Sequence, residues 1–192
     1  DVNYLIENRI HTVNKGDLIL TNTNELHMVS FLSQKPYERY CLVFDPSVAT
    51  ELSTIETSLL NCFTNRDKGE KNIISMTSEE LGNIINLLTR IEYLGSERPF
   101  GSDVLIRAVF IELLVTINSM FNSYCHTNIH KTLPSRLNPV FDYIDHNLHN
   151  DLSLDTLANF FYINKHYLRK LFKSHTGFSL FEYILYRRIA KA

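Results

Sequence analysis

The spacing of apolar residues changes along the chain from a period of two to a period between three and four. In the first 45 residues the apolar positions form short runs or alternations, and Tyr40, Leu42 and Phe44 fall on one face of an extended segment. Turn-forming residues such as Gly16 separate these runs. We therefore predict short β-strands in this part of the chain.

A helical spacing replaces this pattern between residues 46 and 124. Residues 78–94 place apolar side chains three and four positions apart, which predicts an amphipathic helix. Residues 102–121 are apolar around more than half of the helix circumference, which is typical of a helix that is buried on several sides or packs against another chain. We predict that this second helix forms a dimer interface, and a purely intramolecular core helix is the alternative. The predicted interface residues are Leu105, Val109, Leu113 and Ile117.

The last third of the chain carries the capping signals of several short helices. Ser153 and Asn164 are suited to begin a helix, and Gly177 is suited to end one. Ser179 and Glu182 have the spacing of a capping box. Residues 123–139 show little periodicity and contain two prolines, Pro134 and Pro139, as linkers and their borders often do. We predict an α+β protein with a mixed domain over residues 1–124, a linker over residues 125–135 and an all-α unit over residues 136–192.

The segment INKHYLRKLFKSHTG (residues 163–177) predicts a helix with one basic face. At about 100° per residue, Leu168 and Phe172 point to one side of this helix. The opposite side carries only basic and neutral residues over an arc of roughly 100°. Like charges one turn apart destabilise an isolated helix slightly, so the arrangement favours a polyanionic partner. The basic side chains of this arc are His166, Arg169, Lys170 and Lys173.

The charge distribution agrees with such a partner. The chain has a net charge of −2, but residues 1–132 carry 11 basic and 16 acidic side chains, whereas residues 133–192 carry 8 and 5. A helix, a tight turn and a basic helix together form a helix–turn–helix motif, whose second helix enters the major groove of DNA. A solvated basic face without a ligand is the alternative. We predict base contacts from His166, Arg169 and Lys170, and phosphate contacts from Asn164, Lys165, Lys173, Arg187 and Arg188.

The residues do not indicate a membrane span or a metal site. No run of about 18 apolar residues occurs, so we expect no membrane span. Cys41, Cys62 and Cys125 are widely spaced, which predicts free thiols in a reducing cytoplasm. His126 and His130 follow Cys125, but a zinc site needs further ligands at suitable spacing. We therefore predict no metal.

Residues 152–192 carry a set of motif positions beyond the basic face. These positions are Leu152-Ser153-Leu154, Leu157-Ala158, Tyr167-Leu168, Phe172-Lys173, Gly177, Ser179, Tyr183-Ile184, Arg188-Ile189 and Ala192. With them the segment resembles the first helix–turn–helix of AraC/XylS-family transcription regulators. Asn164 stands where this family usually has Ser, and both residues can cap a helix. The resemblance implies a cytoplasmic, sequence-specific regulator of the activator type, acting as a homodimer on double-stranded DNA with RNA polymerase as a further partner.

The N-terminal part resembles the later strands of the cupin-type sensor barrel of the same family. Gly16, Asn22 and His27 have a spacing similar to that of a cupin motif. The resemblance implies a partial barrel followed by dimerisation helices, no cofactor, and a small effector such as a sugar. His27 and Tyr40 are the candidates to bond that effector. The family also has earlier barrel strands and a second helix–turn–helix that are missing from this sequence, so we expect a piece of a longer regulator.

Two other functions remain as alternatives. A dimeric ligand-sensing module that contacts only proteins would share these features but would lack salt-dependent affinity for duplex DNA. A metal-dependent cupin enzyme would need several histidines and a carboxylate that converge on one site. Only His27 occupies a motif-like place, with His11 as its one candidate partner. We therefore predict a regulator and no enzyme.

Overall fold

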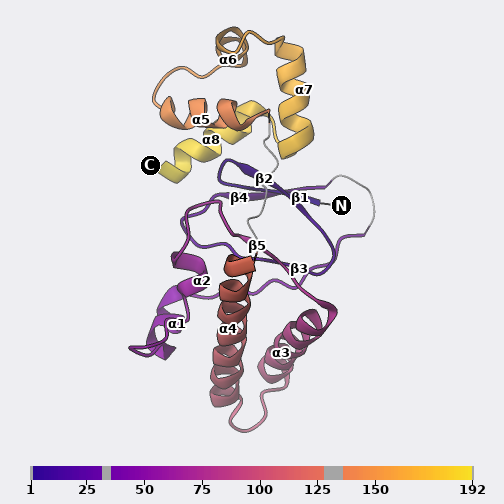
Figure 1. Cartoon of the computed structure of the whole chain (residues 1–192), viewed down its shortest axis with the longest axis vertical. Helices are drawn as coiled ribbons and strands as arrows, with labels where there is room; N and C mark the ends of the chain where they lie inside the picture. Colours follow the sequence, from indigo (N-terminus) through magenta and orange to yellow (C-terminus); the bar gives the residue numbers. More distant parts are fainter. Residues whose placement is uncertain (1, 32–35, 128–135, 192) are drawn as a thin grey trace. The chain divides into compact units, whose positions relative to one another are not determined.

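The computed structural model describes residues 2–31, 36–127 and 136–191. These residues form two compact units, and each unit is assembled from separate stretches of the chain (Figure 1). The N-terminal strands belong to the same unit as the C-terminal helices, although the sequence pattern predicts different domains for these two parts. Of the described residues, 2–14, 23–31 and 136–191 belong to the first unit, and 15–22 and 36–127 belong to the second.

The first unit contains a three-stranded antiparallel sheet. Its strands are β1 (Val2–Ile6), β2 (Arg9–Val13) and β4 (His27–Phe31), in the order β2-β1-β4. The central strand β1 is buried along its whole length. Ile6 pairs with Arg9, so a loop of only two residues, Glu7 and Asn8, joins β1 to β2.

Four helices complete the first unit, and local capping explains most of their ends. The side chains of Ser153 and Asn164 accept hydrogen bonds from the first turns of their helices. Gly177 ends the third helix in the left-handed region, and Ser179 and Glu182 form a reciprocal capping box. These four capping predictions are confirmed. The helices are α5 (Asn138–His146), α6 (Leu154–Phe160), α7 (Lys165–Thr176) and α8 (Leu180–Lys191).

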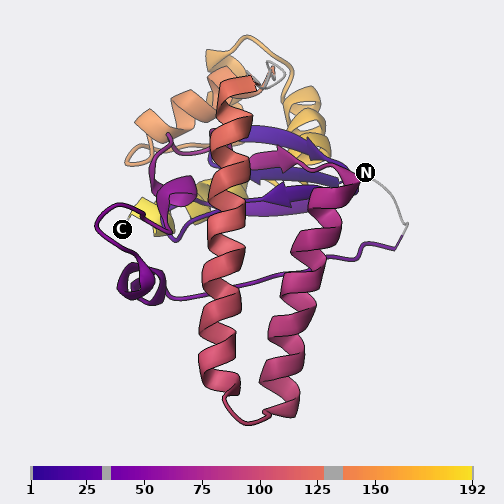
Figure 2. The ribbon, with the colours of Figure 1, turned by 60° about the horizontal axis from the view of Figure 1, so that its bottom comes forward.

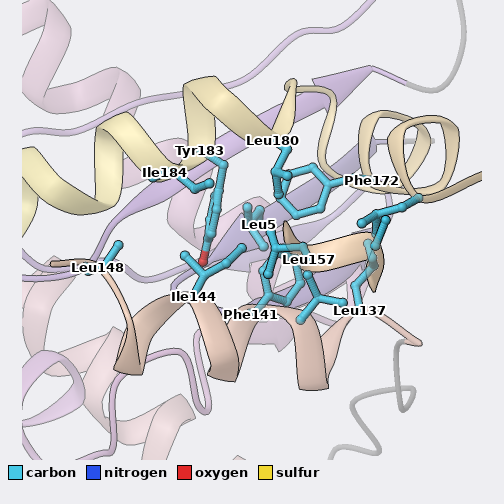
Figure 3. Packing of buried hydrophobic residues seen from close by; sticks show 13 residues of the cluster. Leu5, Leu137, Phe141, Ile144, Leu148, Leu157, Phe172, Leu180, Tyr183 and Ile184 are labelled. Carbon is cyan, nitrogen blue, oxygen red and sulfur yellow. The ribbon is translucent and has the colours of Figure 1, made fainter. Parts of the chain in front are cut away.

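A single hydrophobic core joins the sheet to these helices. Phe141, Phe172 and Tyr183 pack with tilted or edge-on rings, their centroids 5.2–5.5 Å apart, and Leu5 of β1 enters the same core (Figure 3). The hydroxyl of Tyr183 is buried and makes no hydrogen bond to any described residue. Burial raises the pKa of this hydroxyl above its ordinary value.

The second unit packs a two-stranded antiparallel sheet against a long helical hairpin. Figure 2 shows the two long helices α3 and α4 side by side. A capping box of Thr77 and Glu80 begins α3, and Ser78 is its first helical residue, where the predicted helix also starts. The elements are β3 (Asp17–Ile19), β5 (Ile73–Ser75), α1 (Pro46–Leu52), α2 (Asn61–Thr64), α3 (Ser78–Glu97) and α4 (Ser102–Thr127).

The apolar stripe of α4 lies in the core of its own unit. Val109 and Leu113 are each 1% exposed and Ile117 is 6% exposed, in a core shared with α3. The dimer-interface prediction for these three residues is therefore wrong, because α3 covers the stripe within the same chain. Leu105 remains 39% exposed. The stretch Ser102–Tyr124 is long and apolar enough to cross a membrane, but core helices of soluble proteins pass the same test, and 44% of its apolar 18-residue window is buried here.

The described strands do not close into a barrel. They form one sheet of three strands and one of two. The strand predicted to contain Tyr40, Leu42 and Phe44 does not form. Residues 36–45 have no regular secondary structure. Tyr40 and Leu42 are exposed, so the alternating face has no sheet to pack against.

Candidate nucleic-acid interface

The basic face of α7 is open on the surface of the first unit. Leu168, Phe172 and Thr176 of α7 are buried in the core, which turns the opposite side of the helix outward. Its outward-facing side chains are exposed and line a shallow, open hollow. We name this surface the α7 basic face; it consists of His166, Arg169, Lys170, Lys173 and Ser174.

The first turn of α7 is fixed by Asn164. Its Oδ1 accepts hydrogen bonds from the backbone N–H groups of His166 and Tyr167, at 2.8 and 3.3 Å. These two amides are therefore occupied by the cap. Lys165 Nζ lies 3.0 Å from Asp155 Oδ1, and both side chains are exposed. An exposed ion pair contributes at most about 1 kcal/mol, so a phosphate could replace Asp155 as the partner of Lys165.

Arg187 does not belong to the interface. It is only 8% exposed, and its guanidinium binds two carboxylates, those of Glu7 and Asp145. The predicted phosphate contact is wrong for this residue because its charge is already neutralised inside the protein. Burial disfavours the charged form of Arg187, but the hydrogen bond to Glu7 and the negative charges beside it outweigh burial and raise its pKa.

The other basic residues of α8 also bind parts of the same unit. Arg188 is exposed, but its Nε and Nη2 atoms donate to the carbonyl oxygens of Leu148 and Asn150, at 3.0 and 2.8 Å. Lys191 Nζ donates to the carbonyl oxygen of Asp145 at 2.9 Å. These bonds tie α8 to the end of α5 and the loop that follows it. The phosphate contact of Arg188 stays a prediction.

The two predicted effector-binding residues do not face an interior. His27 is exposed, and its ring Nδ1 lies 3.0 Å from the carbonyl oxygen of Glu25. Tyr40 is 59% exposed and lies in an irregular segment. The prediction that both project into a barrel is wrong, because the described strands enclose no barrel interior.

The described residues contain no group of three or more His, Cys, Asp or Glu side chains that could hold a metal. Cys41 is exposed and Cys62 is buried. The side chains of the three candidate zinc ligands, Cys125, His126 and His130, lie outside the described residues.

Sequence reasoning missed Glu7 and Asp145, the carboxylates that bind Arg187. For Glu7 the sequence contained one signal. The two-residue loop of a β-hairpin favours Gly, Asn or Asp, and a Glu at its first position is therefore unusual. Asp145 lies on the inward side of α5, and its role can be recognised only once the fold is known.

Comparison with known proteins identifies the N-terminal half. The family model of the AraC-like ligand binding domain matches residues 2–98, slightly more than half of the chain. The matched stretch includes β1 to β5 and α3, so it contributes to both units. A search of curated proteins and a search of solved structures found no match. Domains of this kind are regulatory sensors and not an enzyme family. The chain therefore belongs to the family of proteins with an AraC-like ligand binding domain.

Proposed function

We propose that the protein is an effector-responsive transcription regulator that binds specific DNA sequences with α7 in the major groove. The observation that carries this proposal is the α7 basic face, which is exposed on a helix whose other side is buried. No acidic residue lies within α7 to neutralise it. The family match supplies the other half of the proposal, a ligand-binding domain in the same chain.

The proposed contacts follow from the position of each side chain on α7. His166, Arg169 and Lys170 lie in the first half of the helix, the part that reaches base edges in helix–turn–helix proteins. Arg or Lys facing a guanine contributes about 1–3 kcal/mol of discrimination between bases. Lys173 lies further along and is suited to bind phosphate, as is Lys165 at the helix start. Asn164 would contact a phosphate through its side-chain Nδ2, because its Oδ1 caps the helix.

The proposed regulation requires a small effector, such as a sugar, that binds the N-terminal domain. Such a ligand acts by its different affinity for two arrangements of the protein. The protein would act in the cytoplasm as a homodimer, which places two recognition helices on separate half-sites, and would contact RNA polymerase as an activator. With the central stripe of α4 buried, Leu105 and the neighbouring exposed residues Phe100 and Val104 remain for a dimer contact.

A salt titration of DNA binding tests the proposal. The probe is a fluorescent duplex of about 30 base pairs with random sequence, titrated with the chain between roughly 50 and 300 mM salt. A variant with Arg169, Lys170 and Lys173 replaced by Gln should lose affinity, and its salt slope should fall by about 0.9 for each phosphate that it no longer neutralises. The control replaces Lys15, Lys68 and Arg90, three exposed basic residues of the second unit, by Gln.

The control variant has the same change in net charge, so its affinity should remain close to that of the unmodified chain. Equal losses of affinity in both variants would show that α7 is not the binding surface. An unmodified chain without salt-dependent duplex affinity would favour the alternative function, a ligand-sensing module that contacts only proteins.

A further inference from the structure

Glu7 occupies a backbone position that is unusual for its residue type. It is the first residue of the two-residue loop between β1 and β2, and its φ angle is 54°. Gly is favoured at such positions because it has no Cβ to clash in the left-handed region. Glu7 is nevertheless 9% exposed, with its carboxylate directed into the protein. A residue that is held in a rare conformation needs contacts that stabilise it there.

Those contacts come from two sides. The backbone N–H of Glu7 donates to the carbonyl oxygen of Leu26 at 2.7 Å, and its Oε1 accepts from the N–H of Leu26 at 3.0 Å. Its Oε2 accepts from Nη1 of Arg187 on α8. The loop is therefore fixed to the residue before β4 and to a helix far away in the sequence.

Arg187 continues the connection to α5. Its Nε and Nη2 atoms donate to Oδ1 and Oδ2 of Asp145, each at 2.8 Å, in a bidentate pair. The side chains of Glu7, Arg187 and Asp145 are 12%, 10% and 18% exposed. One buried guanidinium thus joins the β1–β2 loop, α8 and α5. Loss of one carboxylate would leave part of a buried positive charge without its partner, which is strongly unfavourable.

The same helices hold α7 in position. Tyr183, one helical turn before Arg187, packs against Phe172 of α7. At the C-terminal end of α7, a Cβ built on Gly177 would lie 2.6 Å from Oγ of Ser30 in β4, so the sheet and this end of α7 are in close contact. A shift of the sheet would therefore act on α7 through α8 and through β4.

The sheet leaves the α7 basic face uncovered. His166, Arg169 and Lys170 are all exposed while the Glu7–Arg187–Asp145 cluster is formed. The cluster therefore does not mask the proposed DNA contacts.

We propose that the buried Glu7–Arg187–Asp145 cluster is a coupling element that transmits the state of the N-terminal sheet to the helices presenting the α7 basic face. The consequence for DNA binding rests on the proposed function, whereas the coupling itself does not. The sheet lies within the residues matched by the ligand-binding domain, and the helices lie outside them. The cluster is thus a direct connection between these two parts of the chain.

Hydrogen exchange of the whole chain tests the coupling. Glu7→Gln removes one charge from the cluster and keeps the size of the side chain. We expect exchange to become about tenfold faster in β1, α8 and α7 together, and to stay unchanged in α3 and α4. The matched control is Asp142→Asn, which removes the same charge from an exposed contact between Asn8 and α5. Its exchange should remain within about twofold of the unmodified chain.

Faster exchange confined to the β1–β2 loop would overturn the proposal, as would an equal effect of Asp142→Asn. If the Glu7→Gln variant does not fold, Glu7→Asp keeps the charge but shortens the side chain. It should then give the same pattern with a smaller amplitude. Faster exchange in β1 alone would overturn the proposal for this variant too.

The titration of the random duplex links the cluster to function. Relative to Asp142→Asn, which has the same net charge, Glu7→Gln should weaken duplex binding by about three- to tenfold with an unchanged salt slope, since the α7 contacts themselves are intact. Equal affinities of the two variants would overturn the link to DNA binding. If the unmodified chain does not bind the duplex, the proposed function fails, and the exchange experiment still decides whether the coupling exists.

Discussion

Arg169 and Lys173 lie one turn apart on α7, but the proposed docking gives them different roles. Arg169 is placed for a base edge and Lys173 for a phosphate. We predict that Arg169→Ala relaxes the base preference at one position by about 1–3 kcal/mol. Lys173→Ala should weaken all duplexes similarly and reduce the salt slope by about one unit. Selection from a random duplex pool, followed by titration of chosen sequences, measures both effects. Equal effects of the two variants on every duplex would contradict this assignment.

Cys62 and Cys41 should differ strongly in reactivity. The Cys62 thiol is buried, and burial raises its pKa to about 12. Thiolates are the reactive species, so at about pH 8 Cys62 should react with iodoacetamide about a thousandfold more slowly than an ordinary thiol. The exposed Cys41 serves as the internal reference. Mass spectrometry of a Cys125→Ser variant over time measures the two rates, and similar rates would show that Cys62 is accessible.

The fate of Arg187 shows why single residues are hard to assign from sequence. The pattern of α8 correctly predicts a helix with basic side chains, but it does not show which of the adjacent Arg187 and Arg188 faces inward. The burial of Arg187 depends on Glu7, which is 180 positions away along the chain. The α7 basic face could be predicted because every residue that defines it lies within three helical turns.

Among the secondary-structure elements, helix ends were more predictable than strands. A cap depends on residues three or four positions apart, and so the roles of Ser153, Asn164 and Gly177 follow from the local sequence. A strand needs a partner to pair with, and the alternation around Tyr40 contains no information about whether one exists. The apolar stripe of α4 is ambiguous in the same way. Its pattern shows that the stripe is buried, but not whether α3 or a second chain packs against it.

The capping box of α8 should depend on pH. Glu182 accepts a hydrogen bond from the backbone N–H of Ser179 at 2.7 Å, and the backbone and side-chain bonds with Ser179 lower the pKa of its carboxyl below 4.5. The folded pKa is lower than the unfolded one, so the stabilisation is present above the unfolded pKa and is lost as the pH falls through the folded pKa. An NMR titration of Glu182 should give a midpoint below 4.5, and Ser179→Ala should raise it. Because Ala keeps the backbone N–H, a midpoint that Ser179→Ala leaves unchanged would exclude only the contribution of the Ser179 side chain.

The close contact between α7 and β4 should make Gly177 intolerant of a side chain. Its φ angle is 80°, and a Cβ would lie 2.8 Å from Cβ of Ser30. We predict that Gly177→Ala destabilises the first unit by more than the roughly 1–2 kcal/mol that the left-handed conformation costs. Adding Ser30→Gly to the Gly177→Ala chain should recover only the part of the lost stability that comes from the steric clash. Denaturant unfolding of both single variants and the double variant measures this, and additive effects would exclude a direct clash.

At the scale of the whole molecule, the linear order of the sequence does not give the compact units. The polar segment with two prolines predicts a boundary near residue 130, with strands before it and helices after it. The structure instead places the N-terminal strands in one unit with α5 to α8. Leu5 packs the N-terminal sheet against these helices, because it is buried among Phe141, Leu157 and Phe172. Contacts between residues so far apart are set by the complete fold and leave no periodic signal in either segment.

The interleaved units lead to a final prediction about stability. Leu5 is 2% exposed in the core of the first unit, and Leu113 is 1% exposed in the core of the second. Replacing either residue by Ala should cost about 2–5 kcal/mol of unfolding free energy, because each change leaves a cavity. Leu5→Ala should speed hydrogen exchange in α5 to α8, although it lies more than a hundred residues before them. Leu113→Ala should speed exchange in α3 and α4.

The exposed Val115 supplies the control, since Val115→Ala on the same helix removes little buried surface and should cost less than about 0.5 kcal/mol. Sedimentation should show the same association state for Leu113→Ala as for the unmodified chain, because the side chain lies inside its own unit. If both core variants speed exchange equally in all helices, the chain unfolds as one cooperative body. In that case the sheet cannot act on α7 separately from the rest of the ligand-binding domain, and Glu7 would stabilise the whole chain.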